Sequence, residues 1–195
     1  MVKLVNIIGK VNSGAATKRV CSALADNYGA TIKYGPTSGT VKVLAAALDA
    51  IGVADKDAFI DGCSITVGDV IYLPFKPGVP SNKYPWPAQV AIVAHECEHV
   101  IQWDDDGAAF WFRYFSNKAH RAAYEAAALA AELEVYYRLV GRMLDVQGLA
   151  KGLAWYKVGK ADIAVTAKHL VIVRNTLLRG GEMSDQMKVI AKVLS

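Results

Sequence analysis

Two histidines four residues apart are the feature of this sequence best suited to chemistry. The segment His95-Glu96-Cys97-Glu98-His99 has the spacing HExxH. Residues i and i+4 of an α-helix lie about 40° apart on one face, one turn above the other. Two imidazole nitrogens placed in this way can share one metal ion. We therefore expect His95 and His99 to be metal ligands and Glu96 to reach a metal-bound water as general base.

The residues around this motif are strongly apolar. Val90 to Ala94 precede it, and Val100-Ile101 follow it. Imidazoles and carboxylates on such a helix are costly to bury unless they are paired or bound to a metal. Two core histidines bonded to their neighbours are the simpler alternative. Because one ion would satisfy both rings at once, the pattern favours a metal site.

An HExxH helix that follows a strand and continues as Val100-Ile101-Gln102 resembles the zincin metallopeptidases. It is most similar to small prokaryotic and phage-encoded peptidases with an HExxHxxQ core. The similarity spans about residues 65–134 and is specific only at the motif. It implies a zinc-dependent hydrolase with bound Zn²⁺ and a peptide or protein substrate. It also implies that the strand before the active helix, Val70, Ile71, Tyr72 and Leu73, is the edge with which an extended substrate pairs.

A catalytic zinc has three protein ligands and a water. In the gluzincin branch the third ligand is a Glu on a later helix, so the resemblance makes Glu125 the first candidate. The alanines around it would let its helix approach the metal helix closely, whereas an exposed Arg121–Glu125 pair is the alternative. Glu132, on the same face, is the reserve ligand or a supporting partner. Asp105 is a rival at the last metzincin position, although Gln102 stands where that pattern has Gly.

Zincins hold the developing oxyanion beside the metal with a His, Tyr or Arg side chain. The resemblance therefore points to His120, Arg121 and Tyr124, which flank the proposed third ligand in sequence, and to Tyr114. The alternative for each is packing or solvent exposure.

Helical spacing and capping residues predict a mostly helical chain. Thr40 is the expected N-cap of one helix and Gly52 its stop, and Ser116 is the expected N-cap of the longest helix. The predicted helices cover residues 16–28, 41–51, 88–103, 108–115, 117–144, 161–178 and 184–194.

A β-hairpin is expected directly before the active helix. Ile65–Val67 and Val70–Leu73 are rich in β-branched residues and flank Gly68-Asp69. Because Pro74 follows the second strand, we expect that strand at or near a sheet edge. The prediction is an α+β, mostly helical fold, with residues 1–195 forming a single zincin-like domain. Residues 1–40 and 150–195 carry no chemistry that we can interpret.

Composition narrows the classes of function. The 195-residue chain is 53% hydrophobic, which excludes disorder and favours a homo-oligomer or a larger assembly. A net charge of +4 is too small to indicate nucleic-acid binding. We expect no membrane span and no signal peptide. The three cysteines suggest a reducing compartment, so we expect a cytoplasmic protein or one within a virion assembled there.

The sequence thus predicts a zinc metallopeptidase. The alternative is a non-catalytic structural or assembly component, such as part of a phage particle, that keeps a zincin fold and perhaps its metal. A metal-free helical protein is a third, weaker hypothesis.

Overall fold

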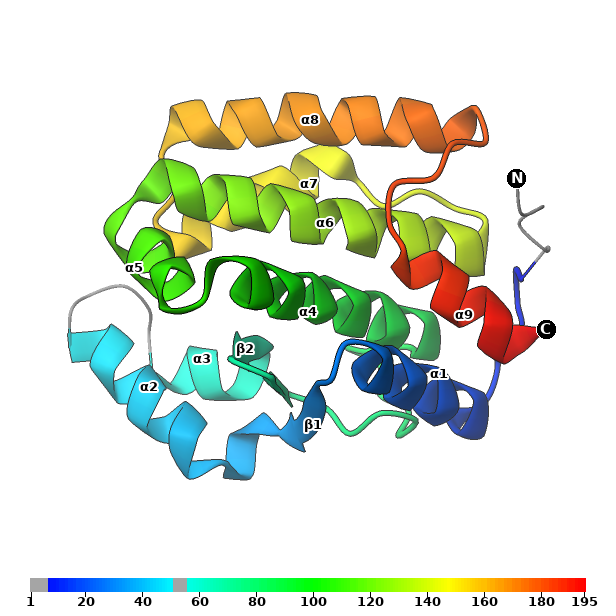
Figure 1. Cartoon of the computed structure of the whole chain (residues 1–195), viewed down its shortest axis with the longest axis horizontal. Helices are drawn as coiled ribbons and strands as arrows, with labels where there is room; N and C mark the ends of the chain where they lie inside the picture. The colour runs from blue at the N-terminus through cyan, green and yellow to red at the C-terminus, as the bar shows by residue number, and fades with distance from the viewer. Residues whose placement is uncertain (1–6, 51–55) are drawn as a thin grey trace.

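The computed structural model describes residues 7–50 and 56–195, and it is a mostly helical α+β fold (Figure 1). A small sheet lies on one side of a central helix, and further helices cover the other side. The helices and strands are α1 (Gly14–Asn27), β1 (Thr31–Tyr34), α2 (Gly39–Ala50), α3 (Lys56–Gly62), β2 (Ile65–Val67), β3 (Val70–Leu73), α4 (Trp86–Asp106), α5 (Ala108–Ser116), α6 (Lys118–Val140), α7 (Val146–Gly152), α8 (Lys160–Leu178) and α9 (Gln186–Leu194).

The central helix α4 carries the HExxH motif. It begins at Trp86 after Pro85, and Pro87 occupies the first turn, where a missing N–H costs no hydrogen bond. The helix continues past its predicted end at Trp103 as far as Asp106. It ends at Gly107, whose φ of 55° is one that glycine adopts without strain. The acidic residues Asp104, Asp105 and Asp106 are therefore part of its last turn.

Helix α6 lies antiparallel beside α4 (Figure 1). Its N-cap is Asn117, not the predicted Ser116, because the Asn117 side chain accepts hydrogen bonds from the first backbone N–H groups of the helix. The helix ends at Val140, before the predicted Leu144. The reason is Gly141, which has a φ of 75° and a left-handed conformation.

The sheet has the strand order β1–β3–β2. The predicted hairpin is confirmed, since β2 and β3 pair antiparallel around the two-residue turn. The prediction that Val70–Leu73 is an edge strand was wrong. Strand β1 pairs parallel to it on its other side, with Thr31 opposite Val70 and Tyr34 opposite Leu73. Val70–Leu73 is the central strand of the described sheet. Pro74 lies just beyond its last paired residue, Leu73, where a missing N–H removes no hydrogen bond of the sheet.

Strand β2 instead lies at one edge of the sheet formed by the described residues. Val67 pairs with Val70 at the turn, and Thr66 faces Ile71. Bonded and non-bonded pairs alternate in an antiparallel ladder, so the backbone N–H and C=O of Thr66 point away from β3. Thr66 is only 4% exposed, so the surrounding chain covers these groups.

Three apolar clusters hold these elements together. The largest joins α1, α4, β3, α9 and the C-terminal half of α6 around side chains such as Leu24, Leu73 and Leu139. A second joins α6, α7 and α8, and a third joins α2 and α3 to the hairpin. Helix α6 thus belongs to two of the clusters and connects α4 to α7 and α8.

Other sequence predictions differ in detail. Helix α2 begins at Gly39, before the predicted N-cap Thr40, and the predicted stop at Gly52 lies outside the described residues. Strand β1, α3 and α7 were not predicted, because four to seven residues give little periodicity. The two predicted C-terminal helices are confirmed as α8 and α9. No helix among the described residues is long and apolar enough to cross a membrane.

Candidate metal centre

Three side chains from α4 and α6 converge on one point. Nε2 of His95 lies 3.6 Å from Oε2 of Glu125, and Nε2 of His99 lies 3.6 Å from Oε1 of the same carboxylate. One ligand atom from each of the three residues falls within 4.8 Å of the others. Their exposed fractions are 9%, 7% and 2%. The predicted set of two His and one Glu is therefore brought together, whereas Asp105 is exposed and outside this group.

Both imidazoles are held by a hydrogen bond at their other nitrogen. Nδ1 of His95 lies 3.1 Å from Oε2 of Glu132, which makes Glu132 a supporting partner. Nδ1 of His99 lies 2.8 Å from Oε1 of Gln102. The Gln102 amide nitrogen donates to the backbone carbonyl of Tyr124, which fixes the orientation of the amide. Both acceptors favour a proton on Nδ1, so both Nε2 lone pairs face the common point.

The site attracts positive charge. Burial lowers the pKa of His95, but the hydrogen bond to Glu132 and the charges of the nearby carboxylates outweigh burial and raise this pKa to about 9. Without an ion, the ring would therefore hold a second proton at neutral pH. A bound cation satisfies the same carboxylates in place of that proton.

Glu96 is positioned by the edge strand. It is buried, and the hydroxyl of Thr66 lies 2.8 Å from its Oε2 and 3.2 Å from its backbone carbonyl oxygen. Glu96 lines the same cavity as the two histidines. Strand β2 thus fixes the carboxylate beside the ligands without making it one of them.

The phenol of Tyr114 supports the third ligand. Its hydroxyl donates to Oε1 of Glu125 at 2.5 Å. Burial and the neighbouring Glu125 charge raise the pKa of Tyr114 well above its usual value, so the phenol remains a donor. Tyr114 therefore fixes the carboxylate that faces both imidazoles.

Arg121 lines the cavity, but its guanidinium is engaged by the backbone. It donates to the carbonyl oxygens of Tyr114, Phe115 and Tyr156 at 2.6–3.0 Å. These bonds join the end of α5 and the segment before α8 to α6. In this arrangement Arg121 positions two tyrosines that border the site.

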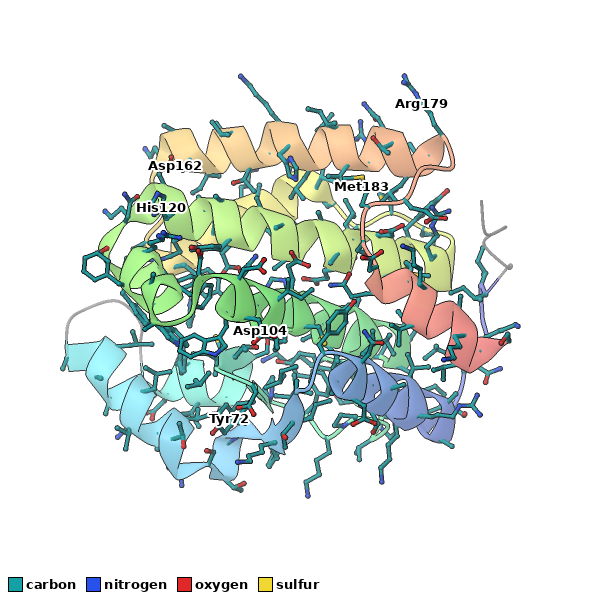
Figure 2. All side chains as sticks on the ribbon, in the orientation of Figure 1. Tyr72, Asp104, His120, Asp162, Arg179 and Met183 are labelled. Carbon is teal, nitrogen blue, oxygen red and sulfur yellow. The ribbon has the colours of Figure 1, made fainter. Side chains whose placement is uncertain are left out.

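Two other predicted oxyanion stabilisers lie away from the cavity. His120 is exposed near the N-terminal end of α6 (Figure 2). The Tyr124 hydroxyl donates to Asp106, which is also paired with Arg113. Neither His120 nor Tyr124 lines the cavity that contains the three ligands. Their expected role follows from nearness in sequence, and the helix turns them to other faces.

Tyr156 borders the site, and no sequence motif indicates it. Its ring lines the cavities on both sides of the ligands. Burial and the charge of Glu125, followed by smaller contributions from Cys63 and Glu96, raise the pKa of its phenol well above the usual value. The phenol therefore stays protonated and remains a hydrogen-bond donor. A tyrosine in a short turn, 31 positions after Glu125, has no periodicity or spacing that would reveal it.

Two cavities meet at the ligands. One, of about 60 Å³, contains His95, His99, Glu96 and Glu125 and is otherwise mostly aromatic. The other, of about 480 Å³, reaches His95 and Glu125 from the opposite side, between α6 and α7. Since one water needs about 10–15 Å³, the smaller space has room for an ion and a few waters. Ser64, which directly precedes strand β2, lines both spaces.

The remaining polar residues of the motif face elsewhere. Cys97 is fully buried, and burial raises the pKa of its thiol far above the usual value. Glu98 accepts a hydrogen bond from Gln186 of α9. The three cysteines are free thiols, and none belongs to the ligand group.

Comparison of the chain with protein-family models, curated proteins and solved structures gives no match. The interpretation of the site therefore depends on the geometry of its own residues.

Proposed function

We propose that this chain is a zinc-dependent peptidase. The observation that carries the proposal is the joint placement of His95, His99 and Glu125 around one point, with the Glu96 carboxylate in the same cavity. Two imidazoles and one carboxylate form a ligand set that zinc uses in hydrolytic sites, where one position stays open. The donors fit the ion because both Nε2 atoms face the carboxylate and both Nδ1 atoms are already satisfied.

A bound zinc would supply a water of lowered pKa and polarise the carbonyl to be attacked. The chain supplies the proton transfers. Glu96 accepts the proton of the attacking water and then donates it to the leaving amine. The Thr66 hydroxyl keeps Glu96 turned toward the cavity during both transfers. In this proposal the Tyr156 phenol, whose residue lines the cavity, donates a hydrogen bond to the negative charge that develops on the carbonyl oxygen.

The test compares purified, zinc-loaded wild-type protein with Glu96→Gln. Cleavage of a mixture of unstructured peptides is followed by mass spectrometry, and bound zinc is measured in parallel. We expect Glu96→Gln to keep stoichiometric zinc and lose about 10²–10⁴-fold in turnover, the usual contribution of a general base.

The matched control is Glu98→Gln, because Glu98 follows on the same helix but bonds to α9. It should retain wild-type turnover. A wild-type protein that binds zinc without cleaving any peptide would contradict the proposal and favour the non-catalytic assembly component.

A further inference from the structure

Of the two cavities at the candidate metal centre, the larger has room for groups beyond an ion and its waters. Its volume is about 480 Å³, and it reaches His95 and Glu125 from the side of α6 and α7. The smaller cavity, of about 60 Å³, contains the three ligands and Glu96. A molecule that reacts at the ion would therefore have most of its volume in the larger cavity.

The acidic and basic side chains around the larger cavity give its wall a negative charge. Among the described residues that line it, the acidic side chains are Glu125 and Glu132, and none is a Lys or Arg. Arg121 lines the smaller cavity and not the larger one. Lys83 lies over the ring of Tyr84 and is not part of the lining. Because a bound ion would compensate Glu125, Glu132 is the carboxylate left for a cationic group of a ligand.

Glu132 has one carboxylate oxygen to spare. Its Oε2 lies 3.1 Å from Nδ1 of His95, whereas its Oε1 has no hydrogen bond or ion pair within the part of the chain that the structure describes. The side chain is 18% exposed and lines the larger cavity. The second oxygen can therefore accept a hydrogen bond from a ligand without releasing the histidine.

The distance from Glu132 to the ion suits an amino terminus. One imidazole ring separates them, because Glu132 bonds to Nδ1 of His95 and Nε2 of the same ring faces Glu125. In a peptide, the α-amino nitrogen lies about 2.5 Å from the carbonyl carbon of its own residue. An α-ammonium group held by Glu132 would bring the first peptide bond toward the ion. The ammonium of a lysine stands on a four-carbon stem and would hold the backbone farther away.

The rest of the lining suits an apolar side chain. Leu129, Leu149 and Leu153 line the cavity from α6, α7 and the turn that follows α7. Two glycines of α7, Gly148 and Gly152, contribute no side chain, which keeps this side of the cavity open. An apolar side chain gains free energy when such a wall covers it.

We infer that this site acts on peptides with a free amino terminus and removes their first residue. Glu132 holds the α-ammonium group through Oε1, and the cavity between α6 and α7 receives the apolar side chain of that residue. Water adds to the first carbonyl carbon and the C–N bond breaks. The proton that Glu96 takes from this water goes to the departing amine, so that one amino acid and a shortened peptide are released. The inference depends on the proposed peptidase function for its choice of ligand.

The test uses three C-amidated tetrapeptides: Leu-Ala-Ala-Ala, its N-acetylated form, and N-acetylated Leu-Ala-Lys-Ala. Their affinities for the zinc-loaded Glu96→Gln protein are measured by calorimetry at pH 7, below the usual pKa of an α-amino group. Their cleavage by the wild-type protein is followed separately by mass spectrometry. We expect the free amino terminus to bind at least about tenfold more tightly than both acetylated peptides. We also expect its first residue to be removed with at least a tenfold higher kcat/KM.

A change of Glu132 tests the assigned partner of the amino terminus. Glu132→Gln keeps an oxygen for His95 and removes the charge, so in the zinc-loaded Glu96→Gln protein it should reduce the preference for the free amino terminus at least about fivefold. Zinc content is measured in the same samples, and the peptide comparison on Glu96→Gln alone decides if zinc is lost. The control is Glu98→Gln, since Glu98 bonds to α9 and lines neither cavity. Equal preference in both variants would overturn the inference.

The remaining outcomes separate this inference from the peptidase proposal. Equal binding and equal cleavage of the free and acetylated peptides would overturn the inference and leave the peptidase standing. An acetylated lysine peptide that binds as tightly as the free amino terminus would assign Glu132 to side-chain ammonium groups and overturn it as well. Preferential binding of the free amino terminus that Glu132→Gln removes, without any cleavage by the wild-type protein, would support the amino-terminus site and contradict the peptidase.

Discussion

The chemistry of the candidate site depends on the hydrogen bonds that orient each ligand. His95 and His99 present Nε2 because Glu132 and Gln102 hold their Nδ1 atoms. Glu125 is held in turn by Tyr114. The ligand atoms therefore stand near their working positions before an ion arrives, which reduces the ordering that binding requires.

Removing a supporting carboxylate should weaken metal binding without removing a ligand. We expect Glu132→Ala to lower zinc affinity by about 10–100-fold, because the His95 ring loses its orientation and the site loses a negative charge. Competition with a zinc chelator measures this. Glu98→Ala removes a carboxylate on the other side of α4 and should leave the affinity unchanged. Equal losses in both variants would indicate a general charge effect instead.

The phenol of Tyr156 should matter for turnover and not for the metal. Tyr156→Phe keeps the ring and removes the donor, so kcat should fall by about 10²–10³-fold while KM and zinc content stay unchanged. The pKa of this phenol is raised well above its usual value, and the neutral donor form therefore persists as the pH rises. The loss in kcat should be the same from pH 6 to pH 9. An unchanged kcat would exclude the phenol from the reaction.

Among the elements, the close antiparallel contact of α4 and α6 is what brings the ligands together. Ala128 is fully buried and shares the face of α6 that carries Glu125 and Glu132, since it lies three residues after one and four before the other. A small side chain there lets the two helices approach, as the alanine-rich sequence suggested. A larger one would push the ligands apart.

Ala128→Leu should therefore disturb both stability and the metal site. We expect the free energy of unfolding to fall by about 1–3 kcal/mol from overpacking, and zinc affinity to fall with it. Chemical denaturation and chelator competition measure the two effects. Ala123→Leu, on an exposed position of the same helix, should change neither. Loss of stability with full zinc affinity would show that the helix separation does not set the ligand geometry.

The sequence predicted long elements and local chemistry better than arrangement in space. HExxH spacing placed His95 and His99 on one helical face, and helical periodicity located α4, α5, α6, α8 and α9. The strand order of the sheet could not be predicted from the sequence. Strand β1 is short and has no alternating pattern, and its pairing with β3 joins distant parts of the chain. Tyr156 was missed for a related reason, since only the folded chain places this turn beside Glu125.

At the scale of the whole molecule, one ion would join two helices that meet only in the folded chain. Helix α4 packs in the largest apolar cluster, and α6 packs in both that cluster and the second. An ion held by His95, His99 and Glu125 is bound only when α4 and α6 are assembled. Metal binding and folding should therefore be coupled.

Zinc should stabilise the protein against heat. At a free zinc concentration 100 times the Kd, binding adds about 2.7 kcal/mol to the free energy of unfolding. For a chain of this size, that corresponds to a Tm rise of about 5–10 °C. Scanning calorimetry with and without a chelator measures the shift, and His99→Ala should show none. A similar rise in that variant would locate the stabilising ion elsewhere.

The most direct test of the central claim is an anomalous difference map recorded at the zinc absorption edge from crystals of the zinc-loaded protein. The account predicts one strong peak about 2.0–2.2 Å from Nε2 of His95, Nε2 of His99 and a carboxylate oxygen of Glu125. A map with no peak at this position, or with its zinc bound by other residues, would contradict it.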